Sequence, residues 1–290
     1  MSALAMTTSR RRRVTDRVAR GLLALATGVA LIPLVLVLYY LINKGIGAWS
    51  GEFFTSDPTG NFLGDQGGVK SAILGTLEMV ALASAVTVPV GIGVALYLVE
   101  YGRDSRFGSV VRYFVDVMTG VPSVVFGLFV YIVLVSTGVG GSGFAGWKGS
   151  TALGLLMLPI VVRSAEVVLL LVPDSLREAA LALGVPRWRV ILRIVLPSAL
   201  SGLVTGSLLA VARAAGETAP LLFTATLVQG TTYDLNQRMN SLPAQIFSDV
   251  QSPNNQLVQR AWGAALALVI LILIITLTAR VLARRSQRTA

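Results

Sequence analysis

A short polar segment between two long apolar segments indicates most clearly how the chain folds. It runs Asp174-Ser175-Leu176-Arg177-Glu178-Ala179-Ala180-Leu181-Ala182-Leu183-Gly184-Val185-Pro186. Ser175 and Glu178 have the spacing of a capping box, and Gly184 suits the left-handed residue that ends a helix. We therefore predict a short helix at about 175–184.

The flanking prolines and the alanines say more about this helix. Pro186 and Pro197 should prevent one continuous helix through the segment. A helix on the surface between two apolar segments would be unremarkable on its own, and that remains the simpler interpretation. However, Ala179 and Ala180 give it a small-residue face with nothing nearby in sequence to pack against, which suits insertion into a groove of another protein.

The rest of the chain has the composition of a membrane protein. Of 290 residues, 54% are hydrophobic and only 13% are charged, about half the charge of an average soluble domain. Apolar runs of about 20 residues are long enough to cross the hydrocarbon core of a bilayer. We predict an all-α membrane protein of six transmembrane helices, at about 21–43, 71–99, 109–136, 150–172, 199–226 and 260–282.

The basic residues orient these spans. Seventeen of the 24 fall in the N-terminal segment, the second and fourth loops and the C-terminal segment, whereas five fall in the other loops. By the positive-inside rule both termini are cytoplasmic. The predicted organisation is a basic cytoplasmic tail at 1–20, a six-helix transmembrane domain at 21–282 and a cytoplasmic tail at 283–290. The run Arg10 to Arg13 resembles a signal peptide, but the apolar stretch after it is too long, so we expect an uncleaved first helix.

Several chemistries are closed to this chain. It has no cysteine and no histidine, which removes disulfides, thiolate chemistry, Cys/His metal sites and histidine general-base catalysis. A phosphate-binding loop needs Gly-Lys-Ser/Thr, and Trp147 separates Gly146 from Lys148 in the nearest approach. We predict that the chain is not an enzyme, holds no metal or cofactor, and does not itself hydrolyse ATP.

The polar segment resembles the cytoplasmic loop of ABC importer permeases. That loop has Glu-Ala-Ala, a glycine four residues after the second alanine, and Ile-x-Leu-Pro after nine more residues. This chain has Glu178-Ala179-Ala180, Gly184 and Ile194-Val195-Leu196-Pro197 at those spacings. The resemblance to type I ABC importer permeases implies that this is the coupling helix, which docks on the ATP-binding subunit through Glu178, Ala179, Ala180 and Gly184.

Charged residues within the predicted spans are costly to insert and are therefore candidates for function. They are Glu78, Asp116, Arg163, Glu166, Arg213 and Glu217. Glu78 and Asp116 suit snorkelling or helix–helix hydrogen bonds, and Arg163 with Glu166 suits a local pair as well as a pathway. Arg213 should lie about 21 Å into its helix.

Two further segments resemble the permease subunits of phosphate importers, the PstA subfamily. They run from Thr119 to Leu128 and from Ala212 to Leu222. Gly120, Pro122 and Gly127 in the first segment indicate a kinked helix, which packing and a position beside a pathway explain equally well. The resemblance implies a phosphate pathway through Arg213 and Glu217, with Arg163 as a second positive step. It also implies a paired homologous permease (PstC), two copies of an ATPase (PstB) that hold ATP and magnesium, and an extracytoplasmic phosphate-binding protein (PstS).

Alternatives remain open at this stage. The chain could be a permease for sulfate, molybdate or phosphonate, or a membrane signalling subunit that responds to an ATPase without moving solute. An intramembrane enzyme is disfavoured by the absence of histidine and cysteine. Arg213 and Glu217 could also form a permanent structural brace.

Overall fold

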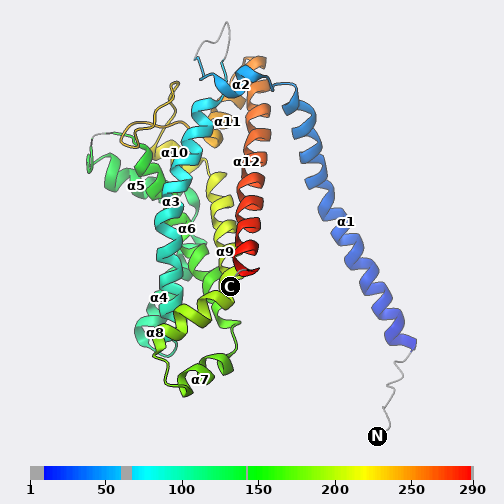
Figure 1. Cartoon of the computed structure of the whole chain (residues 1–290). Coiled ribbons are helices and arrows are strands. Elements are labelled where there is room, and N and C mark those ends of the chain that lie inside the picture. Colours follow the sequence, from blue (N-terminus) through cyan, green and yellow to red (C-terminus); the bar gives the residue numbers. More distant parts are fainter. Residues whose placement is uncertain (1–9, 60–66, 142, 289–290) are drawn as a thin grey trace.

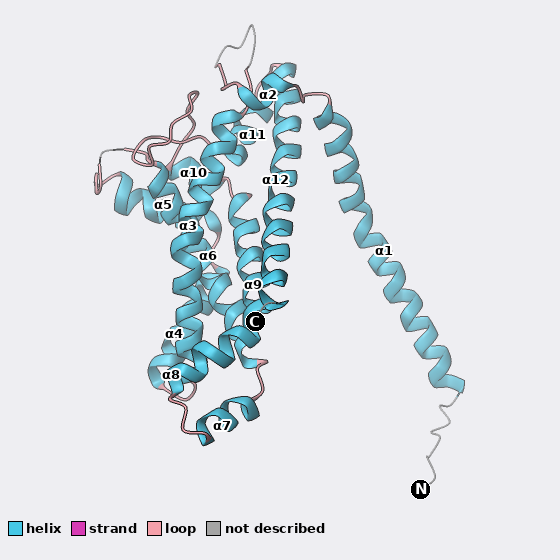
Figure 2. Ribbon diagram, in the orientation of Figure 1, coloured by secondary structure: helices cyan, strands magenta, loops and turns pink. Residues whose placement is uncertain are grey.

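The computed structural model describes residues 10–59, 67–141 and 143–288, and within these ranges the chain folds into helices without a β-strand (Figures 1 and 2). Three five-residue turns, η1, η2 and η3, are π-helical. The helices and turns are α1 (Arg10–Ile46), α2 (Gly51–Thr55), α3 (Lys70–Leu96), η1 (Tyr97–Tyr101), α4 (Arg106–Gly120), α5 (Ser123–Val130), η2 (Tyr131–Val135), α6 (Gly146–Leu170), α7 (Asp174–Ala182), α8 (Arg187–Val190), η3 (Ile191–Val195), α9 (Leu196–Ala215), α10 (Ala219–Thr224), α11 (Leu242–Val250) and α12 (Asn255–Arg288).

The helices long and apolar enough to cross a membrane match the predicted class of protein. Among the described residues there are five, formed by α1, by α3 with η1, by α6, by α8 to α9 and by α12. The bent pair of α4 and α5 makes a sixth if it counts as one span. The prediction of an all-helical membrane protein is confirmed.

The third predicted span is not one straight helix. α4 and α5 meet at an angle of 104°. Val121 has an extended backbone, with φ −74° and ψ 129°, as expected for a residue before proline. Pro122 has no N–H to continue the helical hydrogen bonds. The prediction of a single helix over 109–136 was therefore wrong, whereas the kink expected from Gly120 and Pro122 is present.

The fifth predicted span begins earlier and ends earlier than 199–226. Helical backbone runs without interruption from Arg187 to Ala215, so Pro197 does not stop it. In the π-helical turn before Pro197, each N–H donates to the carbonyl five residues earlier in the chain. Pro197, which has no N–H, lies where the α-helical pattern resumes. The helix then stops at Gly216, and only the short α10 follows.

The ends of the chain are more helical than predicted. α1 begins at Arg10 and α12 continues to Arg288, so residues 10–20 and 283–288 of the predicted tails extend the terminal helices. The remaining tail residues, 1–9 and 289–290, lie outside the described residues. Most of α1 stands apart from the other helices (Figure 1). It packs near its C-terminal end, where Leu41 is buried and the Lys44 ammonium lies 5.5 Å from the ring of Trp262 on α12.

The main core lies where α3, α6, α9 and α10 meet. Met79, Leu153, Met157 and Ala210 are fully buried there. A second buried cluster joins the lower parts of α3, α6 and α9 to α7 and α8, and a third joins α2, α3, α11 and α12 at the opposite end. The helix in the 174–186 segment is thus attached to the bundle by its own apolar contacts.

Candidate functional site

α7 lies at the end of the bundle opposite α2 and α11 (Figure 1). Pro173 occupies the N-cap position and no side chain caps the helix. Ser175 is the second helical residue, so the predicted capping box was wrong; the turn into the helix depends on the fixed φ of proline instead. Gly184 has φ +76° with no atom within 4 Å of the position a Cβ would take. Its backbone conformation, and not crowding, is what favours glycine there.

Arg177 holds α7 on the bundle. Its Nε donates to Glu100 Oε1 on η1 at 3.0 Å. Its Nη1 and Nη2 donate to the Val172 and Leu169 carbonyls at 2.6 and 2.9 Å, at the end of α6. The Arg177 side chain is only 13% exposed and that of Glu100 only 5%. A charge-assisted bond to a buried carboxylate is strong, so α7 should move together with η1 and α6.

The residues of the predicted docking face do not all point the same way. Ala180 is buried against the bundle. Glu178 and Ala179 are exposed, and Leu183 beside Gly184 is 84% exposed. The expectation of one alanine-rich outer face was wrong, because Ala180 serves the internal contact and Ala179 the outer one. The outward surface of α7 therefore combines the carboxylates of Asp174 and Glu178 with apolar side chains.

A cluster of four charged side chains joins α4 to α6. Glu166 Oε1 accepts from Arg112 Nε at 2.7 Å, and its Oε2 accepts from Arg163 Nη1 at 2.6 Å. Arg163 also pairs with Asp116, and Arg112 Nη2 donates to the Leu98 carbonyl at 2.8 Å. The Glu166 side chain is 6% exposed. Two arginines and two carboxylates sum to zero charge, so the cluster is internally neutral.

Arg213 lies in the last turn of α9, and not in the middle of a long helix as predicted. Its Nε is 3.6 Å from Oε1 of Glu217, too far for a good hydrogen bond. The Arg213 side chain is 60% exposed and that of Glu217 15%. Glu217 lies in the break between α9 and α10, so the two residues do not share one continuous helix. The guanidinium is left largely open.

The two segments with phosphate-permease resemblance meet in space. A Cβ at Gly127, on α5, would lie 2.6 Å from the Cα of Pro220, on α10. Only a glycine permits this close approach. The bend at Pro122 and the break after Gly216 thus bring α5 against α10, the short helix that follows Glu217 in the chain.

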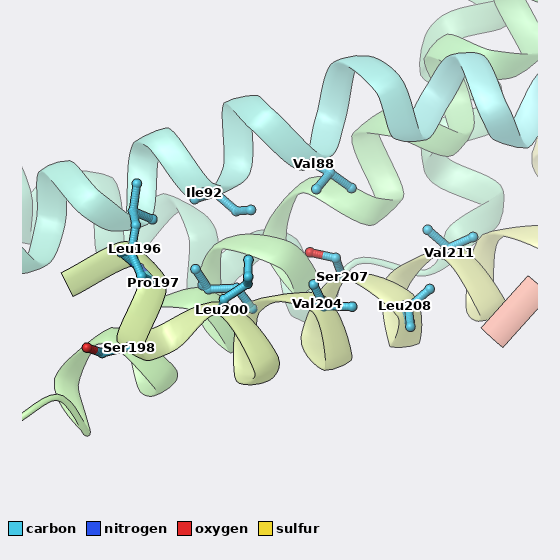
Figure 3. Close-up of a pocket in the computed structure, with 11 residues that line it drawn as sticks. Val88, Ile92, Leu196, Pro197, Ser198, Leu200, Val204, Ser207, Leu208 and Val211 are labelled. Atoms are coloured by element: carbon cyan, nitrogen blue, oxygen red, sulfur yellow. The ribbon is translucent and has the colours of Figure 1, made fainter. Parts of the chain in front are cut away.

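A second surface feature is an apolar groove of about 1030 Å³ between α3 and α9 (Figure 3). Val88 and Ile92 line it from α3, and Leu200, Val204 and Val211 are among the residues that line it from α9. No charged side chain lines it. Anion chemistry at α9 therefore belongs to other faces of the helix.

Sequence reasoning missed the partners of these charges. Arg112 and Arg177 were counted only as topology signals, yet both are bound to buried carboxylates. Their spacing from Glu166 and Glu100 spans more than 50 residues, so no local pattern could identify the pairs. Glu78 also differs from expectation, because its buried Oε2 has no hydrogen-bond partner among the described residues.

The fold and the loop helix define a class of protein, the membrane subunit of a transporter that works with separate subunits. Residues 87–289 match the family of binding-protein-dependent transport system inner membrane components. The chain belongs to this family and, within it, groups with the phosphate transport system permease proteins PstA. It is a multi-pass membrane transport subunit and not an enzyme.

Relatives and solved structures support this placement. The chain is 41% identical over 280 residues to PstA of Yersinia pestis, which covers 94% of this chain and 93% of the relative. It is 42% identical over 285 residues to PstA 1 of Mycobacterium tuberculosis (strain ATCC 25618 / H37Rv), covering 96% and 91%. A chain of a bacterial alginate ABC transporter shares the fold at 18% identity, with TM-score 0.63 and 96% of each chain covered. A chain of the MetNI methionine ABC transporter does so at 18% identity, with TM-score 0.59 and 75% and 94% covered.

Proposed function

We propose that this chain is the membrane permease of an ATP-driven importer of inorganic phosphate and forms half of its translocation pathway. The observation that carries the proposal is its 40–43% identity, over most of its length, to several phosphate transport system permease proteins PstA. The open guanidinium of Arg213 at the break after α9 is consistent with it.

Arg213 and Glu217 are the proposed anion step. A guanidinium binds a phosphate or a carboxylate through two parallel hydrogen bonds. Glu217 partly neutralises the arginine when no ion is present, and its 3.6 Å separation leaves donors of Arg213 uncommitted. A passing phosphate would share or replace Glu217 as the partner. Such a site binds weakly enough to release the ion again.

α7 is the proposed coupling helix. Glu178, Ala179, Leu183 and the turn at Gly184 present the outward surface, whereas Ala180 and Arg177 hold the inner side. A partner that moves α7 would pull on Glu100 and on the end of α6 through Arg177. Because α6 also holds Arg163 and Glu166, that motion would reach the charge cluster between α4 and α6.

The partners follow from the same proposal. The second half of the pathway would come from PstC, ATP and magnesium would bind to two copies of PstB at α7, and PstS would deliver phosphate at the opposite end. Both termini would be cytoplasmic. This chain itself would hold no cofactor.

Uptake by the reconstituted complex tests the proposal. The four kinds of subunit are placed in vesicles with ATP enclosed, and uptake of labelled phosphate is measured with excess sulfate, molybdate or phosphonate outside. We expect ATP-dependent uptake that unlabelled phosphate suppresses and the other anions do not. Stronger competition by another oxyanion would reassign the substrate, and stimulated ATPase activity without any uptake would favour a signalling subunit.

A further inference from the structure

A groove with a partly polar lining lies on the α7 side of Arg213, between α6, α9 and α12. Its volume is about 690 Å³. Its polar lining consists of Arg163 and Ser164 from α6, Ser201 and Thr205 from α9, and Arg280 from α12. Two guanidiniums and three hydroxyls therefore line one open space, although the contributing segments of α6, α9 and α12 are more than 30 residues apart along the chain.

The close contact of α6 and α9 forms one side of the groove. A Cβ at Gly206 would lie 2.6 Å from Cβ and Oγ of Ser164, and one at Gly202 would lie 2.5 Å from Val168. The two glycines let the helices approach and keep the groove open. Arg213 follows on the same face of α9, because positions 202, 206, 209 and 213 repeat at helical spacing. Seven residues separate Gly206 from Arg213, about 10 Å along the helix.

The charge at the groove comes from Arg280. Arg163 is already committed to Glu166 and Asp116, so its charge is neutralised. Arg280 is exposed, and no carboxylate among the described side chains pairs with it. Among the side chains that the structure describes, the net positive charge at the groove therefore comes from Arg280, a residue that the sequence motifs do not include.

We propose that this groove is a binding site for a phosphate group, with Arg280 as its charged ligand and the Ser201 hydroxyl as a hydrogen-bond donor. The Thr205 hydroxyl donates to the Ser201 carbonyl at 2.8 Å, so it does not serve as a donor to the ligand. The phosphate group belongs either to the transported ion, in which case the site rests on the proposed function and follows Arg213 toward α7, or to the headgroup of an anionic lipid. The volume would hold roughly 20 water molecules at about 30 Å³ each. An ion would therefore bind with part of its hydration shell, which suits a weak site.

The absence of cysteine allows a direct test. Val167 lines the groove and its apolar side chain supplies no ligand, so Val167→Cys serves as the reporter in the complete transporter, held in phosphatidylcholine nanodiscs. An anionic thiol reagent labels this chain with and without inorganic phosphate. We expect phosphate to slow labelling, and Arg280→Gln to raise the phosphate concentration needed roughly 10-fold, as for one lost charge-assisted hydrogen bond.

Matched variants keep the result interpretable. Arg280→Lys should retain most of the protection, and Ser201→Ala should weaken it without changing charge. Arg17→Gln, which removes the same charge from α1 far from the groove, should change nothing. Protection by inorganic phosphate in phosphatidylcholine discs identifies the ion as the source. Protection on adding phosphatidylglycerol without phosphate identifies the lipid headgroup.

The inference is overturned if neither phosphate nor phosphatidylglycerol slows labelling, or if Arg280→Gln behaves as the parent chain does. Uptake by the parent complex is measured in parallel. Protection without phosphate uptake would reject the proposed function and keep the site, whereas uptake without protection would do the reverse.

Discussion

Arg163 and Arg213 look alike in the sequence and differ in the structure. Each lies in a long apolar helix, and each has a glutamate three or four residues later. Arg163 contacts carboxylates on both α4 and α6, one of them almost completely buried. Arg213 has a single partner at 3.6 Å and a side chain that is 60% exposed. Arg163 is a charge-neutralised contact between α4 and α6. Arg213 is a charged side chain whose hydrogen-bond donors are not fully used by its single carboxylate partner.

The difference identifies which kind of arginine can serve an anion. Removing one member of a buried pair leaves an unpaired charge and destabilises the fold. An exposed, loosely paired arginine can change partners at little structural cost. We therefore expect substitutions in the cluster of Arg112, Asp116, Arg163 and Glu166 to affect assembly, and substitutions at Arg213 to affect transport.

The largest effect is expected from Glu166→Gln. This change leaves Arg112 and Arg163 without their shared buried carboxylate, at a cost of about 3–5 kcal/mol. The amount of folded complex and its melting temperature in detergent should both fall clearly. Glu217→Gln is the matched control, because it removes an equivalent charge from the open pair and should leave assembly intact. Equal stability of the two variants would contradict the distinction between the arginines.

The next effect is expected from Arg213→Gln. Losing charge-assisted hydrogen bonds worth about 1.5–3 kcal/mol should reduce phosphate uptake roughly 10- to 100-fold. Membrane insertion and complex assembly, measured by co-purification, should be unchanged. The double variant Arg213→Gln with Glu217→Gln decides between a transport residue and a brace. Restored uptake in that variant would show that the pair is structural.

A third arginine, Arg177, is held by a buried carboxylate as Arg163 is, and it fixes the inner side of α7. The coupling role of α7 can be tested at its C-terminal end, at Gly184. Gly184→Val forces a β-branched residue into a left-handed conformation, at a cost of about 1–2 kcal/mol. We expect ATPase stimulation by the loaded binding protein to fall while the complex still assembles. Gly184→Asn is the control, since asparagine tolerates this conformation.

Glu178→Lys complements the glycine variants, because it reverses the charge on the outward surface and leaves the backbone alone. It should also lower the stimulated ATPase activity. Normal stimulation in both Gly184→Val and Glu178→Lys would mean that α7 does not transmit the signal.

The smallest expected effect comes from a labelling experiment on the positions of the two arginines across the membrane. Arg163 should be in the cytoplasmic half, near α7, and Arg213 in the other half. Leu183, beside Gly184, and Gln256, in the first turn of α12, are both exposed, so a single cysteine at either position can be reached by a reagent on its own side of the membrane. In intact cells an impermeant thiol reagent should label Gln256→Cys and not Leu183→Cys. Labelling at position 183 without permeabilisation would invert the orientation.

The sequence alone was enough for the class of protein. Apolar runs of about 20 residues predict membrane helices because the bilayer allows few other solutions. A loop helix near 175–184 was also predictable, as was the kink near Pro122, since proline removes a donor whatever surrounds it. Each of these properties depends on residues that are close together in the sequence, so it can be predicted without knowing the tertiary contacts.

The tertiary structure decided which charges are paired. Glu166 with Arg112 and Glu100 with Arg177 are 54 and 77 residues apart, and only the packing of α4 against α6 and of α7 against η1 brings them together. It also turned Ala180 inward and ended α9 just after Arg213, with Gly216 and Pro220 near the break. A helical pattern specifies which residues share a face. Whether that face meets a carboxylate, another helix or open space depends on elements distant in sequence, so Arg163 and Arg213 could be told apart only in the folded chain.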